Sequence, residues 1–308
     1  MVCECKVRFN IVLGILLALL AVACSSSDDE ELIEDARQEI TVVFSPNGLG
    51  DQGYNDLILR GVQQFAVHNS DVSMQFCMPV DLAGGEQRVR EWLDAAVNEE
   101  GKRLLVLASN DYSDICREIL KDVRIDTLNN VVILFENEGL QDLPVHTFDL
   151  SMYGASFLAG VALGEFLRDI YESNDAEFSP AEIPVLIMEA YEGAGQIGAA
   201  ADGFIDGYKE AEGVAPQVSF AYLAEDWSGY SMADNVYAQL SEWHNQYEFI
   251  YPLAGGSNEG VYRFLREYNW SFISAGMDVD KQNEGDVILG SLLKHIDNIV
   301  FDLLNLLC

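Results

Sequence analysis

The hydrophobic positions of the chain fall into two alternating patterns from residue 40 onward. Short continuous apolar runs, such as 40–44 and 104–108, predict strands that are buried on both faces. The stretches between these runs, such as 55–67, repeat apolar residues every three or four positions and predict amphipathic helices. Strands that alternate with helices of this length indicate an α/β fold in which helices cover both faces of parallel sheets.

The alternation separates into two successive series. In the first we expect strands 40–44, 72–78, 104–108, 131–135 and 145–150, with helices 55–67, 86–98 and 114–120. In the second we expect helix 153–169, strands 184–188, 218–223, 249–253 and 271–276, helices 196–212, 231–243 and 258–268, and a last helix 287–306. Because 308 residues exceed what one hydrophobic core usually serves, we predict two lobes joined by crossing hinge segments. The N-terminal lobe comprises 39–149 plus 276–308, and the C-terminal lobe comprises 150–275.

The first 23 residues have the features of a signal peptide. Basic side chains precede an apolar run, 11–23, that is too short to span a bilayer comfortably. The run ends in A-V-A-C, which resembles a bacterial lipoprotein cleavage site and would make Cys24 the lipidated first residue. Residues 24–38, rich in Ser, Asp and Glu, then form an acidic tether. The alternative is an ordinary signal peptide with a chance cysteine.

The charge of the chain excludes one class of partner. There are 51 acidic side chains against 17 basic ones, which gives a net charge of −34. Nucleic-acid binding depends on Lys and Arg that neutralise phosphates, so we expect no nucleic-acid partner.

The sequence offers little for catalysis or metal binding. Cys77, Cys116 and Cys308 are odd in number and lack metal-type spacing, so no disulfide framework is implied. The four histidines are scattered, and neither H-E-x-x-H nor G-x-S-x-G occurs. Asp278 and Asp280 could suggest a divalent cation, but no motif places a further ligand beside them. We therefore expect no metal, no cofactor and no enzymatic activity.

One motif points formally to a dinucleotide. Residues 193–198 read G-A-G-Q-I-G between an expected strand and helix. Dinucleotide binding requires the first glycine at the strand end and an acidic residue about 20 positions later. Here Glu189 and Glu192 stand before the glycines, where they would repel a pyrophosphate, and the acidic pair that follows the next strand, Glu225 and Asp226, lies about 30 positions away. The structural alternative is a flexible turn whose glycines let helix 196–212 pack closely on its sheet.

Polar and aromatic residues gather where the expected strands end. The turn G-L-G-D-Q-G-Y-N after strand 40–44 places Tyr54 and Asn55 at a helix start, where small ligands bind in open α/β sheets. The others are Asp111, Asp114, Trp227, Tyr230, Gly255, Gly256 and Asp278. Lys294 lies on an apolar stripe of the expected last helix, where an unpaired amine is costly, and Asp278 is its candidate partner. Taken singly, most of these residues could simply cap helices or face solvent.

Several motifs together resemble the BMP/PnrA-like family, the purine-nucleoside-binding lipoproteins of ABC importers. G-D-Q-G-Y-N at 50–55 resembles the family's D-x-S-F-N, and Y-G-A-S-F-L-A-G at 153–160 resembles Y-x-x-G-Y-L-A-G. A-G-G-S-N-E-G at 254–260 matches A-G-x-T-G-x-G, and G-M-D-V-D-K-Q at 276–282 matches G-V-D-x-D-Q with one insertion. S-L-L-K at 291–294 matches the S-x-x-K that follows.

The resemblance implies a type I periplasmic binding protein with its ligand between the lobes. By the same resemblance, Tyr54 and Trp227 sandwich the base, and Asn55 contacts its edge together with Asp114, or alternatively Asp111. Contacts to the ribose carry over to the Gly255–Gly256 turn, Asp278 and Lys294. The family's G-F-x-x-x-D reads S-N-D-Y-S-D at 109–114, so this sequence departs from the family at the base-binding loop.

The function implied is that of a solute receptor that hands a nucleoside, a purine by preference, to an ABC permease. We expect a monomer in the cell envelope, anchored through Cys24 on the periplasmic or outer face of a bacterial membrane. Two alternatives remain open. The same fold could bind a sugar or another small metabolite, since sugars also stack on aromatic rings. The chain could also be an enzyme, either a nucleoside hydrolase or a dinucleotide oxidoreductase.

Overall fold

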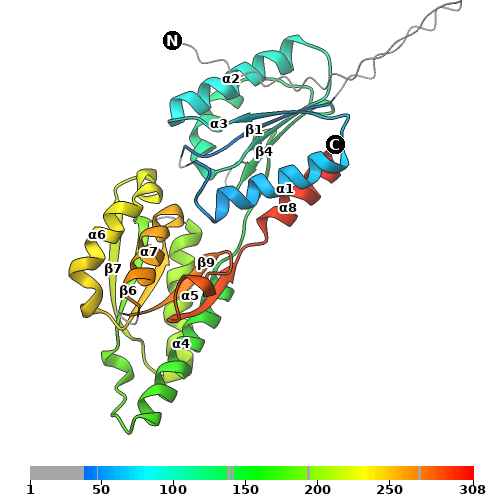
Figure 1. Ribbon diagram of the computed structural model, residues 1–308. Coiled ribbons are helices and arrows are strands. Elements are labelled where there is room, and N and C mark those ends of the chain that lie inside the picture. The colour runs from blue at the N-terminus through cyan, green and yellow to red at the C-terminus, as the bar shows by residue number, and fades with distance from the viewer. Residues whose placement is uncertain (1–37, 47, 137–139, 141, 193–194, 270–271) are drawn as a thin grey trace, which may run out of the picture. The chain divides into compact units, whose positions relative to one another are not determined.

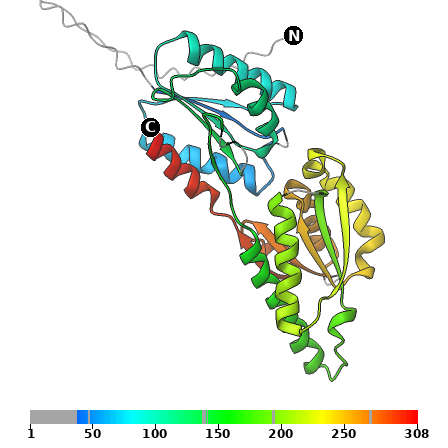
Figure 2. The same ribbon diagram turned by 180° about the vertical axis from the view of Figure 1, so that it is seen from behind.

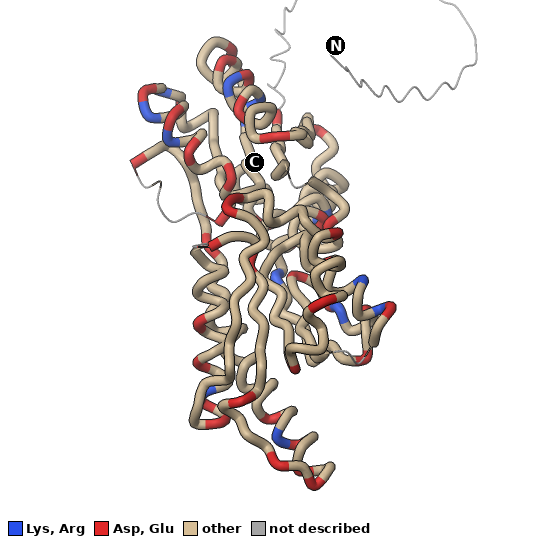
Figure 3. Tube along the Cα trace, turned by 90° about the vertical axis from the view of Figure 1, so that its left-hand side faces the viewer, with Lys and Arg blue, Asp and Glu red and all other residues tan. Residues whose placement is uncertain are grey.

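The computed structural model describes residues 38–46, 48–136, 140, 142–192, 195–269 and 272–308, all within one compact unit. The predicted signal peptide, Cys24 and nearly all of the tether lie outside the described residues. Within the described residues, no helix has the length and apolar character needed to cross a bilayer. Asp and Glu are spread along both halves of the described chain, whereas Lys and Arg are few (Figure 3).

The first sheet contains five parallel strands. They are β1 (Glu39–Val43), β2 (Ser73–Cys77), β3 (Arg103–Leu107), β4 (Asn130–Phe135) and β5 (His146–Phe148), in the order β2-β1-β3-β4-β5. Helices α1 (Tyr54–His68), α2 (Leu82–Asn98) and α3 (Ser113–Leu120) connect them (Figure 1). Successive side chains of a strand point to opposite faces. Ile40 and Val42 therefore reach the core beneath α1, while Val43 reaches the core beneath α2 and α3, which explains the unbroken apolar runs.

The second sheet repeats this arrangement. Its parallel strands are β6 (Pro184–Tyr191), β7 (Gln217–Ala224), β8 (Phe249–Leu253), β9 (Ile273–Asp278) and β10 (Ile288–Leu293), in the order β10-β9-β8-β6-β7. The helices are α4 (Tyr153–Ser173), α5 (Gly195–Glu212), α6 (Ala233–Trp243) and α7 (Glu259–Glu267). Counted from the first strand of each series, both sheets have the order 2-1-3-4-5. Short 3₁₀ turns occur at Asn110–Tyr112, Pro180–Glu182, Trp227–Ser231, His244–Gln246, Gly255–Asn258 and Gln282–Glu284.

The end of the chain differs from the prediction. Instead of one helix over 287–306, the structure has strand β10 and then helix α8 (Ile296–Leu307), with Lys294 between them. The run V-I-L-G-S-L-L is short and is interrupted by Gly290 and Ser291, a pattern that periodicity alone does not assign to helix or strand. Because β9 and β10 belong to the second sheet, the predicted boundary at 276 is wrong. Only α8 returns to the first sheet, where it lies beside α1 (Figures 1 and 2).

Close packing of α4 against α5 depends on glycines that both helices supply. A Cβ atom at Gly160 of α4 would lie 2.0 Å from the carbonyl oxygen of Phe204, and one at Gly207 of α5 would lie 1.9 Å from that of Phe157. By contrast, a Cβ atom at Gly195 or Gly198 would meet no atom within 4 Å. The described glycines of the G-x-G-x-x-G run therefore do not make the close contact that we expected of them, and Gly193 lies outside the described residues.

A pair of substitutions in α4 tests this contact. Gly160→Ala should lower the free energy of unfolding by about 1–3 kcal/mol, because the added methyl group must displace the backbone of α5. Gly154→Ala, in the same helix, meets no neighbouring atom and should raise it by up to about 1 kcal/mol through helix propensity. Denaturant unfolding of both variants measures the difference, and equal stabilities would contradict the packing described here.

Candidate functional site

The strand order of each sheet creates a crevice at one point. In the order 2-1-3-4-5, the connections after the first and third strands leave in opposite directions, so the ends of these two strands border an open space. Ser45 follows β1, and Ser109 and Asn110 follow β3. Tyr191 ends β6 and Leu253 ends β8. All five residues line one cavity of about 480 Å³, so the crevices of the two sheets form a single site.

The start of α1 presents an acceptor to this cavity. Asp51 Oδ2 accepts hydrogen bonds from both the backbone nitrogen and Nδ2 of Asn55, at 2.8 and 2.9 Å. A carboxylate only accepts hydrogen bonds, so the amide nitrogen of Asn55 must face Asp51 and its oxygen must face away. Asn55 Oδ1 is buried and has no partner among the described residues. The first sheet therefore offers an unpaired acceptor to an N–H or O–H group of a ligand.

Aromatic rings line the cavity from both sheets. Tyr54 comes from the first turn of α1, and the second sheet contributes Tyr191, Trp227 and Tyr230. The centroid of the Tyr191 ring lies 5.2 Å from that of Trp227 and 6.0 Å from that of Tyr230, so these three rings form one cluster. Flat apolar ring faces contributed by both sheets suit a planar ligand.

A glycine turn brings Tyr230 to the cavity wall. Gly255 has a φ of +53°, a conformation that side chains disfavour, and a Cβ atom there would lie 2.8 Å from Tyr230 Cδ1. Asn258 Oδ1 accepts a hydrogen bond from the backbone nitrogen of Ala254 at 2.9 Å and holds the turn closed. Glycine at 255 thus serves both the turn and the approach of the ring.

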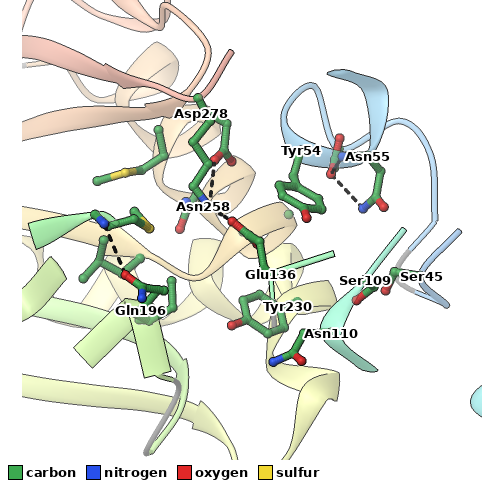
Figure 4. Close-up of a pocket in the computed structure, with 18 of the residues that line it drawn as sticks. Ser45, Tyr54, Asn55, Ser109, Asn110, Glu136, Gln196, Tyr230, Asn258 and Asp278 are labelled. Atoms are coloured by element: carbon green, nitrogen blue, oxygen red, sulfur yellow. Dashed lines mark hydrogen bonds and ion pairs between the residues drawn. The ribbon is translucent and has the colours of Figure 1, made fainter. Parts of the chain in front are cut away.

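One amine lies among carboxylates from both sheets. Lys294 Nζ is 3.1 Å from Glu136 Oε1, 4.0 Å from Asp278 Oδ1 and 5.2 Å from the centroid of the Tyr54 ring. Glu136 follows β4 in the first sheet, whereas Asp278 ends β9 in the second. Tyr54, Glu136 and Asp278 point toward the same space (Figure 4). The predicted pairing of Asp278 with Lys294 is present, but Glu136 is the closer partner.

Burial and mutual proximity shift the pKa values of these groups. Burial raises the pKa of Asp278, and the nearby Asp51 and Glu136 add to this shift, while Lys294 opposes it. Burial alone would lower the pKa of Lys294, but the carboxylates of Glu136 and Asp278 raise it above its ordinary value. The amine therefore stays charged at neutral pH. Burial also raises the pKa of Tyr54, with the charge of Glu136 as the next cause, so its phenol stays neutral.

Most of the predicted site residues lie together. Tyr54, Asn55, Trp227, Gly255, Gly256, Asp278 and Lys294 all line the cavity. Asp111 is buried behind it, where its Oδ2 accepts a hydrogen bond from Ser45 Oγ at 2.7 Å. Asp114 does not belong to the site. Its side chain is 94% exposed on α3 and pairs with Arg117 at 2.7 Å, because the 3₁₀ turn after β3 directs it outward.

The cavity also contains residues that the sequence analysis did not select, among them Glu136, Asp149, Tyr191, Gln196 and Asn258. Tyr191 was missed because β6 continues three residues beyond the predicted end at Met188. Glu136 and Asp149 directly follow β4 and β5, so the strand-end rule that selected Asp278 could also have found them.

The arrangement provides stacking faces, hydrogen-bond groups and charges. Within the described residues, no three His, Cys, Asp or Glu side chains are grouped to hold a metal ion. Asp278 faces Lys294, whereas Asp280 Oδ1 accepts a hydrogen bond from the backbone nitrogen of Gln282 at 3.0 Å. The two carboxylates that could suggest a cation thus have different partners.

Comparisons with known proteins agree with this architecture. The family model for ABC transporter substrate-binding protein, PnrA-like, matches residues 38–305. A solute-binding protein of an ABC transporter system from Aeropyrum pernix K1 is 17% identical with a TM-score of 0.68, over 87% of this chain and 70% of that one. GanP, a glucose-galactose binding protein from Geobacillus stearothermophilus, is 14% identical with a TM-score of 0.56, over 89% and 90%.

A LacI family transcriptional regulator from Enterococcus faecium, with bound ribose, is 14% identical with a TM-score of 0.57, over 87% of this chain and 88% of that one. No curated protein sequence matches the chain. Identities this low establish the fold alone. The predicted fold, two parallel sheets in the manner of a type I periplasmic binding protein, is confirmed.

Asp111 and Asp114, the two aspartates between which the sequence did not decide, should respond differently to neutralisation. Burial raises the pKa of Asp111 above its ordinary value of 3.8, so the folded state holds the proton more tightly than the unfolded chain. Ionisation therefore costs stability as the pH rises above 3.8. We expect Asp111→Asn to be more stable than the wild type at pH 7, with the gain disappearing below pH 3.8.

Asp114→Asn should leave stability unchanged at both pH values, because an exposed ion pair contributes little. Urea unfolding at the two pH values measures both variants. A loss of stability in Asp111→Asn at pH 7 would show that its ionised form is needed where it is buried.

Proposed function

The chain belongs to the PnrA-like family of ABC transporter substrate-binding proteins, and from this premise we propose that it binds a purine nucleoside in the cavity between its two sheets. Members of this family bind a small molecule outside the cytoplasm and deliver it to a membrane permease. The observation that carries the proposal is that aromatic rings from both sheets share one cavity with the Asp278–Lys294 pair. A base requires the first feature and a ribose the second.

The physical chemistry of a nucleoside suits each wall of the cavity. The base would lie between Tyr54 and the cluster of Tyr191, Trp227 and Tyr230, with each stacked face contributing about 1–3 kcal/mol. Asn55 Oδ1 would accept a hydrogen bond from an N–H group on the base edge. Asp278 would accept hydrogen bonds from the paired ribose hydroxyls, and Lys294 would donate one.

The energies show that stacking alone is insufficient. Micromolar affinity requires about 8 kcal/mol net. Two stacked faces supply roughly 2–6 kcal/mol, before the cost of association is subtracted. The polar groups must therefore contribute, which is why an unpaired buried acceptor at Asn55 supports the assignment.

A free sugar is the second candidate ligand. Aromatic rings beside a carboxylate also suit a pyranose, and proteins of similar fold include a glucose-galactose binding protein and a transcriptional regulator with bound ribose. A sugar would use the charged part of the cavity beside Asp278 and Lys294. It would leave some of the aromatic rings without a planar partner. Competition between nucleosides and their component sugars separates the two candidates. The proposal assigns no catalytic step to the site.

Calorimetric titration with guanosine, inosine, adenosine, ribose and glucose tests the assignment. We expect purine nucleosides to bind and Trp227→Ala to weaken their affinity by roughly tenfold or more. This factor corresponds to the lower end of the stacking energy of one ring face. Phe220→Ala is the matched control, because Phe220 is an aromatic residue 45% exposed on β7 outside the cavity lining. Folded protein that binds ribose or glucose but no nucleoside would replace this proposal with the sugar.

We also propose that Cys24 is lipidated and anchors the protein to a membrane. The support is the sequence A-V-A-C after an apolar run, followed by an acidic tether. Several buried acyl chains, at about 0.8 kcal/mol per CH₂, hold a protein firmly. The full-length protein expressed in a bacterium should partition into the detergent phase, and Cys24→Ser should move it to the aqueous phase. Recovery of both in the aqueous phase would indicate an ordinary cleaved signal peptide.

A further inference from the structure

Backbone strain concentrates on the charged side of the cavity. In the described part of the chain, four residues other than glycine have a positive φ, and three of them are Gln52, Glu136 and Asp278. The carbonyl oxygen of Gln52 accepts a hydrogen bond from Lys281 Nζ at 3.1 Å, while Glu136 and Asp278 flank Lys294. Strained residues persist where the surrounding structure fixes them and are frequent at ligand sites.

Glu136 is the least expected of the three. Its φ of +51° is a conformation that residues with a Cβ disfavour relative to the ordinary helical region, and glycine would adopt it without that cost. A glutamate at such a position indicates that its carboxylate performs a task. Its side chain is 21% exposed and points into the cavity (Figure 4).

The distances show which carboxylate determines the position of the amine. Glu136 Oε1, at 3.1 Å, is within hydrogen-bond reach of Lys294 Nζ, whereas Asp278 Oδ1, at 4.0 Å, is beyond it. The backbone nitrogen of Lys294 donates to the carbonyl oxygen of Asp278 at 3.0 Å, which attaches its main chain to the second sheet. A lysine stem is flexible, so a second attachment is needed to fix its end.

We infer that Glu136 is a positioning residue of the ligand site, which holds the Lys294 ammonium at the cavity and links the end of β4 to the second sheet through it. The inference rests on the proposed function for its consequence in binding, but not for the ion pair itself. A neutral side chain at 136 would leave the ammonium with Asp278 as its nearest charged partner. The amine would then move toward Asp278 and away from the place where a ligand hydroxyl meets it.

The first test measures the amine without any ligand. The chain has six lysines, so labelling with ¹³C-lysine gives few signals, and Lys294→Met assigns the one of interest. The groups that face this amine are Glu136 after β4, Asp149 after β5, Asp278 on β9 and the Tyr54 ring on α1. In Glu136→Gln the pKa of Lys294 should shift downward, since one of the charges that raise it is removed. An unchanged titration would overturn the inference.

The second test measures binding, with guanosine, inosine and adenosine as probes. Glu136→Gln should weaken the affinity roughly tenfold, and the alkaline loss of affinity should begin at a lower pH than in the wild type. The matched control is Glu284→Gln, which removes one of two carboxylates that bridge Arg266 outside the cavity lining and should change neither quantity. A loss of affinity with no change in the pH profile would mean that Glu136 contacts the ligand directly, and would also overturn the inference.

A third variant guards against a simple folding defect. Glu136→Gly removes the backbone strain and should be at least as stable as the wild type while binding as weakly as Glu136→Gln. A stable glycine variant with full affinity would contradict the positioning role. If the wild type itself binds no nucleoside, the proposed function fails, whereas the lysine titration still decides the inference.

Discussion

The structure depends on the order in which parallel strands pair. Both sheets place the first strand of their series between the second and the third, so that connections diverge at the same edge. This order makes the ends of β1, β3, β6 and β8 into walls of one cavity. The same order places β1, β3, β6 and β8 inside their sheets, where they are buried almost throughout, which is why the sequence shows continuous apolar runs there. The same constraint therefore produces the hydrophobic pattern and the location of the site.

Electrostatics then restricts what the cavity can hold. Asp51, Glu136, Asp149 and Asp278 line it, whereas Lys294 is the only basic side chain in its described lining. Asp51 is already bound by backbone and side-chain N–H groups at the start of α1, and Asp149 Oδ2 accepts a hydrogen bond from Gln196. What remains for a ligand is an excess of acceptors near one amine. A neutral molecule with many N–H and O–H donors fits this better than a phosphorylated one.

Much of the fold and part of the site could be predicted from the sequence. Apolar runs such as the one at β1 located nine of the ten strands in the described part of the chain, since strands buried on both faces leave a plain signal. The missed strand, β10, has a run too short to show a period. Helix α2 begins at Leu82 rather than at the predicted residue 86, because Asp81 Oδ1 accepts a hydrogen bond from the backbone nitrogen of Gly84 at 2.8 Å. The rule that ligands bind where parallel strands end selected Tyr54, Trp227 and Asp278. It could do so because the end of each strand can be read from the order of residues along the chain.

The remaining site residues depend on details that chain order does not determine. Asp111 and Asp114 are three positions apart, yet Asp111 belongs to the 3₁₀ turn and is buried, whereas Asp114 belongs to the first turn of α3 and is exposed. The partnership of Glu136 with Lys294 joins residues 158 positions apart, one directly after β4 of the first sheet and one directly after β10 of the second. Both outcomes require three-dimensional proximity that no local pattern records.

The return of α8 to the first sheet has a consequence for biosynthesis. Ile296, Val300 and Leu304 are buried in the same core as β1 and α1, and their burial contributes roughly 4–9 kcal/mol. That is comparable to the whole stability of an ordinary domain. A nascent chain therefore carries an unfinished N-terminal half through all of translation up to α8. Folding that proceeds from the N-terminus therefore leaves this part of the apolar core exposed until α8 is available to cover it.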